Sequence, residues 1–276
     1  MKFIALLLLV AGFVHASEPL EKSASELEKS APELEKLFTD GGVSAGTGTF
    51  VLYDISANQL RIHNAERGST RFIPASTYKI PNSLIALQTG AVKDLAEILT
   101  YGGTKQPFPQ WERDMNLRDA FKVSNVPVYQ GVARRIGLDR MRQWIGRLDY
   151  GNQEVGTAVD QFWLKGPLKV SAIEQTRFLA RLAQGQLPVK PEVLAQVKDI
   201  STVETTDVYV LHAKTGWCNS TNPDLGWYVG WIERKDTGNL YAFALNIDMP
   251  NPKSDTQKRI PLARACLTAL GALPGQ

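Results

Sequence analysis

The sequence is poor in residues that bind metals or form disulfide bonds. It has three histidines and two cysteines among 276 residues. A zinc site normally needs three or four clustered His, Cys or carboxylate ligands, and no such spacing occurs here. Cys218 and Cys266 alone do not form a disulfide framework in a chain of this length, and whether they pair stays open. The sequence therefore predicts no metal site and no disulfide-dependent fold.

A strong excess of one charge is also missing. The chain has 31 Lys and Arg against 28 Asp and Glu, for a formal net charge of +3 at pH 7. Proteins that bind nucleic acid usually carry a basic patch, and no run of Lys and Arg is present. We therefore expect no nucleic-acid partner. The hydrophobic share of 43% is typical of a soluble globular protein with a large core.

The one strongly apolar run is short and lies at the N-terminus. Lys2 precedes an apolar stretch over residues 5–14, and the small residue Ala16 follows it. A positive start, a short apolar stretch and a small-residue exit are typical of a secretory signal peptide. The run is too short to span a bilayer. We expect a signal peptide at 1–16, export to the periplasm, and no membrane association of the mature chain.

Residues 17–40 contain a heptad-like repeat. Leu20, Leu27 and Leu34 each begin a Leu-Glu-Lys sequence, seven residues apart. Pro32 and the short length argue against a coiled coil. We expect an amphipathic leader helix or a flexible arm at 17–40, followed by a single catalytic domain at 41–276.

The pattern within 41–276 predicts an α+β fold of the α/β sandwich type. The middle, about 75 to 199, is mostly helical, with a capping box from Ser171 to Glu174 and Pro191 in the first turn of another helix. A last helix is expected from Thr256 to Leu270. The predicted strands lie at both ends of the chain: Thr47–Asp54, Gln59–His63, Val208–Thr215, Gly226–Glu233 and Leu240–Asp248.

These elements fit one antiparallel sheet of about five or more strands flanked by helices. The first and last strands would pair in a sheet lobe made of about 41–66 and 200–276. A mainly helical lobe, about 67–199, would be inserted between them. We expect the functional cleft where the two lobes meet.

The first candidate for chemistry is the sequence Ser-Thr-Tyr-Lys at 76–79, the one Ser-x-x-Lys in the chain. Side chains at i and i+3 share a helix face, so Ser76 and Lys79 would lie together. A serine hydroxyl needs a base to become a nucleophile, and a lysine can serve only if burial suppresses its charge. Pro81 supports a helix that begins near Ser76, because proline is tolerated only in the first turn. By itself the pattern arises about once by chance in a chain this long.

Two further elements gain meaning from the first. Lys214, Thr215 and Gly216 end a predicted strand, where a substrate could lie along the edge beside a positive charge and a hydroxyl. Ser124 follows the helical segment 117–123 and could bridge the two lysines by hydrogen bonds and carry protons between them. Taken singly, these elements also fit a strand that ends in a turn and a serine that caps one.

Together the three elements resemble those of the penicillin-recognising serine enzymes, and the finer resemblance is to class D, the oxacillinase-type β-lactamases. The sequence also has Tyr150-Gly151-Asn152 after the helical lobe, Trp163 shortly after it, and Arg259 near the last helix. The resemblance covers roughly residues 45–272. It implies the serine β-lactamase and penicillin-binding-protein transpeptidase fold. It also implies hydrolysis of small-molecule β-lactams through a serine acyl-enzyme, which gives antibiotic resistance.

The resemblance also implies individual roles. Ser76 would be the nucleophile. Lys79 would be carboxylated by carbon dioxide, and the carbamate would act as general base, so carbon dioxide or bicarbonate replaces any other cofactor. The remaining expected roles are these: backbone amides of Ser76 and Trp217 as oxyanion hole; Phe121, Val126 and Trp163 as walls around the carbamate, with the Trp163 indole N–H as donor; and Lys214, Thr215, Gly216 and Arg259 as binders of the substrate carboxylate. Arg264 is a rival to Arg259, and Tyr150 fits either the cleft or the core.

Three other functions remain as alternatives. A Ser-His-Asp hydrolase would want a Gly-x-Ser-x-Gly elbow, which is missing, and His63 and His212 are expected to be structural. A β-lactam sensor domain would share the serine motif and acylate without turnover, but such sensors depend on membrane segments. A transpeptidase acting on peptidoglycan would usually carry an anchor or further domains. Substrate range and oligomeric state, monomer or homodimer, stay open.

Overall fold

The structure is a computed structural model that describes residues 28–275. The predicted signal peptide at 1–16 and residues 17–27 of the predicted arm at 17–40 lie outside the described residues. Among the helices of residues 28–275, none is long and apolar enough to cross a membrane.

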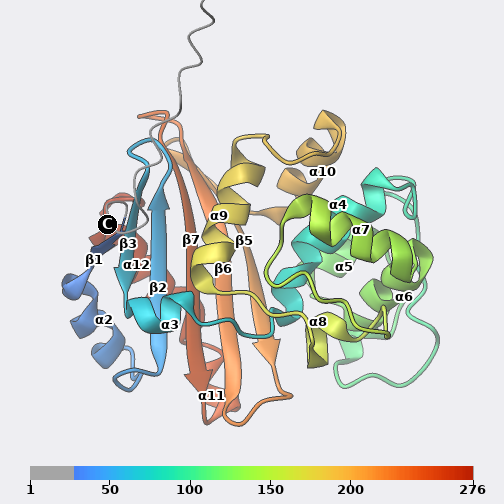
Figure 1. Cartoon of the computed structure of the whole chain (residues 1–276), viewed down its shortest axis with the longest axis horizontal. Helices are drawn as coiled ribbons and strands as arrows, with labels where there is room; N and C mark the ends of the chain where they lie inside the picture. The colour runs from blue at the N-terminus through green and yellow to red at the C-terminus, as the bar shows by residue number, and fades with distance from the viewer. Residues whose placement is uncertain (1–27, 276) are drawn as a thin grey trace, which may run out of the picture.

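A seven-stranded sheet forms the centre of the molecule, in the order β1-β3-β2-β7-β6-β5-β4 (Figure 1). All neighbouring strands are antiparallel except β1 and β3, which pair in parallel. The strands are β1 Glu28–Ser30, β2 Gly48–Asp54, β3 Gln59–His63, β4 Thr202–Thr205, β5 Tyr209–Cys218, β6 Asp224–Arg234 and β7 Leu240–Met249. The five predicted strands and the pairing of the first with the last are confirmed, and two short strands add to the edges.

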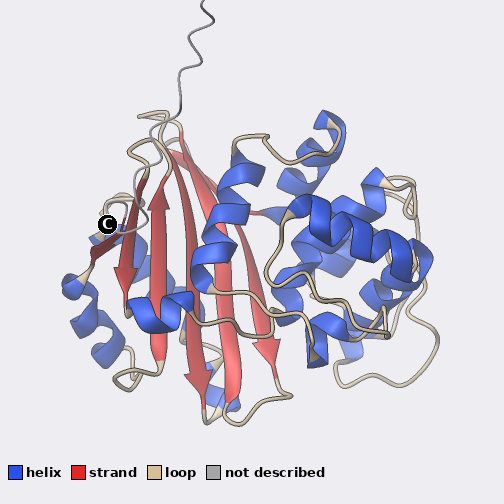
Figure 2. Cartoon of the chain, in the orientation of Figure 1, coloured by secondary structure: helices blue, strands red, loops and turns tan. Residues whose placement is uncertain are grey.

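Helices cover both faces of the sheet and form a separate group beyond β5 (Figures 1 and 2). α9 packs on one face, against β2, β6 and β7, while α12 packs on the other. The helices are α2 Glu35–Asp40, α3 Ala65–Ser69, α4 Lys79–Gln88, α5 Leu117–Lys122, α6 Val126–Ile136, α7 Leu138–Leu148, α8 Phe162–Lys165, α9 Ala172–Ala183, α10 Pro191–Ser201, α11 Pro252–Asp255 and α12 Arg259–Ala269. Short 3-10 turns are η1 Pro32–Leu34, η2 Ala75–Tyr78 and η3 Pro109–Trp111.

Local signals in the sequence placed several of these helices correctly. Ser171 accepts from the Glu174 amide and the Glu174 carboxylate accepts from the Ser171 amide, which confirms the capping box of α9. Pro191 is the first residue of α10. The last helix, predicted from Thr256 to Leu270, is observed as α12 from Arg259 to Ala269, and the short helix α11 that precedes it was not predicted.

Two expectations for strands need correction. β5 does not end at Thr215 but continues to Cys218, because β6 pairs with it along its whole length. The described part of the predicted arm is also no single helix: residues 28–30 form β1, and Phe38 on the short helix α2 is buried. The sheet is therefore mixed rather than purely antiparallel.

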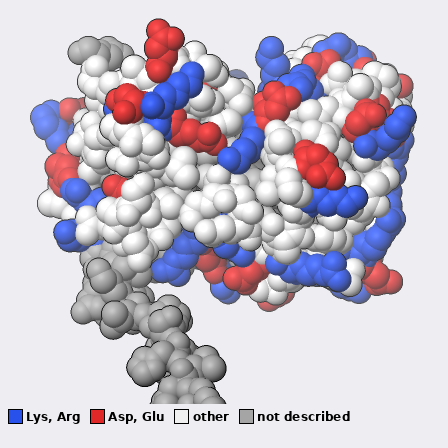
Figure 3. Space-filling model, turned by 90° about the horizontal axis from the view of Figure 1, so that it is seen from above, with Lys and Arg blue, Asp and Glu red and all other residues white. Residues whose placement is uncertain are grey.

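Within the described residues, the surface charges and the cysteines indicate no nucleic-acid site, disulfide or metal site. On the face shown in Figure 3, basic and acidic side chains lie near one another between uncharged areas. Cys218 and Cys266 are both buried and unpaired. Within residues 28–275, no group of three His, Cys, Asp or Glu side chains could hold a metal ion.

Candidate active site

Ser76 lies in a strained turn at the boundary between the sheet and the helical lobe. The turn η2 holds Ser76, and α4 begins only at Lys79, so the helix starts three residues later than a start at Ser76 would give. Ala75, just before the serine, has a φ of +49°, a left-handed conformation that is uncommon for residues with a Cβ. Ala75 and Thr77 are buried while Ser76 is half-buried, so the turn presents the serine alone.

Lys79 contacts Ser76 directly. Its Nζ donates a hydrogen bond to the Ser76 Oγ at 2.9 Å, as the i, i+3 spacing predicted. The lysine is only 1% exposed. Burial, and secondarily the positive charge of Lys214, lower the pKa of Lys79 well below its usual 10.5. A neutral amine, which can accept a proton, is thus favoured beside the serine hydroxyl.

Tyr129 forms one wall of the lysine pocket and was not predicted. The Lys79 Nζ lies 5.1 Å from the centre of the Tyr129 ring. The Tyr129 hydroxyl pairs with the Ser83 Oγ at 2.8 Å, and the Ser83 Oγ donates to the Lys79 carbonyl at 2.7 Å. A serine four residues after Lys79 on the same helix face was the one available signal for this support.

Trp163 lies in an aromatic cluster next to the same turn. It is fully buried on α8, and its ring stacks on Tyr78 with centroids 5.5 Å apart. Phe162 packs against both rings. The Trp163 indole N–H makes no hydrogen bond to the described part of the chain, although buried donors usually have a partner. The cluster therefore holds the Trp163 indole against Tyr78, two residues after Ser76.

Lys214 projects from the free part of the β5 edge. β4 pairs with β5 only as far as His212, so the edge is open from residue 213 onward. Lys214 is 5% exposed, and its Nζ lies 5.6 Å from the centre of the Phe121 ring. Burial, followed by the charge of Arg259, lowers the pKa of Lys214 to about 7. Phe121 is therefore a wall of this site, as predicted, but on the Lys214 side.

Gly216 allows β5 to approach the nucleophile turn closely. A Cβ at Gly216 would lie 3.0 Å from both the Pro74 carbonyl oxygen and the Thr77 Cγ2. These contacts are tighter than almost all real Cβ contacts, so a residue without a side chain suits this close approach. The next residue, Trp217, is 39% exposed and its Nε1 donates to Asp224 at 2.6 Å. The oxyanion hole from the Ser76 and Trp217 amides stays a prediction.

Arg259, rather than Arg264, reaches the end of β5 near Gly216. Its Nη1 donates to the Gly216 carbonyl at 2.6 Å and its Nε to the Thr256 carbonyl at 2.9 Å. Burial lowers the pKa of Arg259 to about 10, so the guanidinium stays charged at neutral pH. The rival, Arg264, is paired with Glu204 at 2.6 Å.

Two buried lysines, Lys79 and Lys214, and the half-buried Arg259 thus lie at this site without acidic partners. No carboxylate of the described residues lies within ion-pair distance of Lys79, Lys214 or Arg259; the ion pairs of residues 28–275 all involve other groups. Buried charges are normally paired, because desolvation is costly. An uncompensated set of this kind attracts an anionic ligand.

Ser124 is near this site but does not make the predicted bridge. It has a φ of +55° in the turn between α5 and α6, and its hydroxyl makes no hydrogen bond to either lysine in the described structure. Val126, expected near the carbamate, is the half-buried first residue of α6. The Trp111 Nε1 donates to the Val123 carbonyl at 3.0 Å, so the loop around 101–115 packs on the turn that carries Ser124.

Comparison with known proteins agrees with this geometry. A family model described as the penicillin binding protein transpeptidase domain matches residues 48–268. The solved class D β-lactamase FUS-1 (OXA-85) from Fusobacterium nucleatum subsp. polymorphum is 40% identical, with a TM-score of 0.83, over 89% of this chain and 100% of that chain. The chain belongs to the class D β-lactamases.

Other class D relatives cover similar lengths. β-Lactamase OXA-5 of Pseudomonas aeruginosa is 37% identical over 278 residues, which is 100% of this chain and 98% of that protein. β-Lactamase OXA-48 of Klebsiella pneumoniae is 42% identical over 203 residues, or 74% of this chain and 76% of that protein. The predicted resemblance, the transpeptidase-type fold and the assignment as a serine β-lactamase are confirmed.

In this class D chain, Tyr150-Gly151-Asn152 has a structural role. Gly151 has a φ of +58°, and a Cβ there would collide with the Lys169 carbonyl oxygen. Asn152 bonds the same segment, residues 167–169: it donates to the Pro167 carbonyl at 3.0 Å and accepts from the Lys169 amide at 2.9 Å. Tyr150 is 1% exposed. Of its two predicted alternatives, the core aromatic is the one observed.

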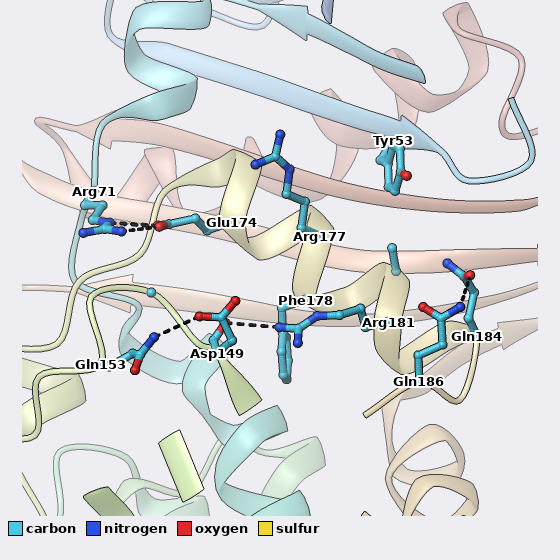
Figure 4. Close-up of a pocket in the computed structure, with 12 residues that line it drawn as sticks. Tyr53, Arg71, Asp149, Gln153, Glu174, Arg177, Phe178, Arg181, Gln184 and Gln186 are labelled. Carbon is cyan, nitrogen blue, oxygen red and sulfur yellow. Dashed lines mark hydrogen bonds and ion pairs between the residues drawn. The ribbon is translucent and has the colours of Figure 1, made fainter. Parts of the chain in front are cut away.

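The class D cleft continues beyond Lys214 as a cavity of about 670 Å³. Its walls include Phe121, Lys122, Val203, Lys214, Thr215 and Ile260. A second hollow of about 540 Å³ lies on the outer side of α9 (Figure 4), where Arg71 pairs with Glu174 and Arg177 projects nearby. It contains no candidate nucleophile with a base, so the chemistry belongs to the first cleft.

The two histidines of the described chain serve the core of this class D fold. His63 stacks on Phe38 at 4.1 Å, and His212 stacks on Trp231 at 4.4 Å. Neither hydrogen-bonds to Ser76 in the described structure. This arrangement leaves a Ser-His-Asp mechanism without its base.

Proposed function

We propose that this protein hydrolyses the β-lactam ring of penicillin-type antibiotics through an acyl-enzyme on Ser76. The observation that carries the proposal is the 2.9 Å hydrogen bond between a buried, preferentially neutral Lys79 and the Ser76 hydroxyl. A base in contact with a serine is the arrangement that activates it as a nucleophile. The named relatives are β-lactamases, which supports the same substrate class.

The substrate would be held by the basic side chains around the serine. Its carboxylate would bind Arg259, Lys214 and the Thr215 hydroxyl, since arginine suits bidentate carboxylate recognition. The Ser76 oxygen would then attack the ring carbonyl carbon, and the carbon–nitrogen bond would break. Lys214, with a pKa of about 7, is suited to hold the proton that the ring nitrogen requires. For Ser124 to carry protons in this step, its hydroxyl would have to turn toward the lysines, since it bonds to neither in the described structure.

Carboxylation of Lys79 by carbon dioxide fits the surroundings of that side chain. Only a neutral amine reacts with carbon dioxide, and burial favours that form. The buried Trp163 indole N–H would donate to the carbamate anion, and Lys214 supplies positive charge. Bound in this way, the carbamate would supply the general base for both acylation and hydrolysis.

Export by the predicted signal peptide at 1–16 would place this activity in the periplasm, where it would protect cell-wall synthesis from β-lactams. Antibiotic resistance would follow from hydrolysis before the drug reaches its targets. This part of the proposal rests on the sequence pattern of residues that the structure does not describe.

Turnover tests the function. Purified protein mixed with a chromogenic cephalosporin should release product far beyond one equivalent. Ser76→Ala should abolish both the burst and the steady state. Ser69→Ala, which removes an exposed hydroxyl bonded only to the Glu66 carbonyl, serves as the matched control. A burst that stops at one equivalent would instead favour the β-lactam sensor.

A further inference from the structure

A chain of buried hydrogen bonds connects α9 to the turn that carries Ser76. The Tyr150 hydroxyl donates to the Gln175 Oε1 at 3.1 Å, and the Gln175 Nε2 donates to the Thr77 Oγ1 at 2.9 Å. The Thr77 hydroxyl then donates to the Pro74 carbonyl at 2.8 Å. Each of the three side chains is 1% exposed. Each of these three side chains therefore has a defined donor or acceptor role, and the hydrogen bonds all run in one direction, from Tyr150 to Pro74.

The turn needs such support because its backbone is strained. A residue with a Cβ in the left-handed region, such as Ala75 with a φ of +49°, is strained and persists only when its surroundings fix it. Upstream, the Trp227 Nε1 donates to the Ile73 carbonyl at 2.9 Å. Downstream, the bond from Gln175 fixes Thr77. The strained residue thus lies between two buried anchors.

The same atoms set how close the turn lies to β5. The Pro74 oxygen and the Thr77 Cγ2 are the two atoms that a Cβ at Gly216 would approach most closely, both at 3.0 Å. Ser76 lies between them on one side, and Trp217 follows Gly216 on the other. A shift of the turn would therefore change the separation of the Ser76 and Trp217 amides. Donors of an oxyanion hole act only within a narrow distance range, about 2.7–3.1 Å from the oxyanion.

We propose that Gln175 is a positioning residue for acylation, which holds the Ser76 turn against β5 through Thr77. This proposal rests on the proposed acylation of Ser76. It assigns to Gln175 no contact with the substrate. Its effect is on the transition state, where the oxyanion forms, rather than on the initial binding of the intact β-lactam.

The test compares variants that interrupt this series of hydrogen bonds with a variant that removes an equally buried hydroxyl elsewhere. Gln175→Leu removes both bonds of Gln175 at similar volume. Thr77→Val removes the hydroxyl, whereas Thr77→Ser keeps it. The control is Thr176→Val, because Thr176 is fully buried on the same helix and its hydroxyl bonds only the Ile173 carbonyl. For each, single-turnover kinetics give the acylation rate constant and the dissociation constant of the first complex, and thermal unfolding gives Tm.

We expect Gln175→Leu and Thr77→Val to lower the acylation rate constant about 10- to 100-fold with little change in the dissociation constant. Thr77→Ser should stay within about threefold of the unsubstituted protein. Thr176→Val should lower Tm yet acylate normally in its folded form. If Gln175→Leu does not fold, the Thr77→Val and Thr77→Ser pair gives the same comparison.

The proposal is overturned if folded Gln175→Leu or Thr77→Val acylates as fast as Thr176→Val, since these hydrogen bonds would then contribute only to the stability of the fold. Failure of the unsubstituted protein to acylate would instead refute the proposed function. The two failures are therefore distinguishable in one set of measurements.

Discussion

Replacing Trp163 with phenylalanine isolates the contribution of its indole N–H to carboxylation of Lys79. Trp163 is fully buried and stacks on Tyr78, so truncation to alanine would also cost about 3–5 kcal/mol of stability. Phenylalanine keeps most of the aromatic packing and removes the donor. The comparison thus separates loss of a hydrogen bond from loss of the fold.

The size of the effect follows from the charge of the acceptor. A hydrogen bond to a charged group contributes about 1.5–3 kcal/mol. At about 1.4 kcal/mol per tenfold, its loss should weaken carboxylation of Lys79 about 10- to 150-fold. The assay is steady-state hydrolysis of a chromogenic cephalosporin over a bicarbonate series. The half-saturating bicarbonate concentration should rise by that factor, and saturating bicarbonate should restore much of the rate.

Trp144→Phe is the matched control, because Trp144 is a buried tryptophan of α7 that packs with Arg147 outside the site. It should keep the bicarbonate dependence of the unsubstituted protein. A Trp163→Phe variant with that same dependence would refute the role given to the indole N–H. No bicarbonate response in any variant would count against carboxylation itself.

Three further predictions follow from the described geometry. Activity should fall as pH falls through the lowered pKa of Lys79, because the protonated amine cannot react with carbon dioxide. Excess bicarbonate should move the midpoint of the rate–pH profile to lower pH. A midpoint that does not change with bicarbonate would contradict this. Arg259→Ala should raise KM for β-lactams about 10- to 100-fold, because it removes a charged partner of the substrate carboxylate. Arg264→Ala breaks only the ion pair with Glu204 and should change KM little. Equal effects of the two substitutions on KM in steady-state kinetics would argue against the role given to Arg259. Gly151→Ala should lower Tm far more than Gly185→Ala, since both positions have positive φ but only Gly151 would also collide with a carbonyl, and equal Tm shifts would refute the collision.

The sequence predicted the parts of the fold that depend on local chemistry. The local residue pattern located β2 and β3, and the Ser171–Glu174 capping box located the start of α9. The i, i+3 spacing placed Ser76 beside Lys79. Each of these signals acts over a few residues, so no tertiary information was needed.

What the sequence did not reveal depends on partners distant along the chain. β5 was expected to end at Thr215, but the facing residues of β6 extend it to Cys218. Gln175 lies 98 positions from Thr77, and nothing in its own neighbourhood marks it as a hydrogen-bond partner. Tyr129 likewise reaches Lys79 only because α6 packs on α4. Such contacts exist only after the helical lobe has closed.

The pairing of β2 with β7 has a consequence for how the molecule is assembled. Residues 48–54 find their partners at 241–247, so the centre of the sheet cannot form until most of the polypeptide is available. Contacts between residues this distant in the sequence make folding slow, because the entropy of closing a long loop is lost before the strand hydrogen bonds form. A chain truncated before Leu240 should therefore leave β2 with an unsatisfied edge and remain prone to aggregation, however intact its serine motif is.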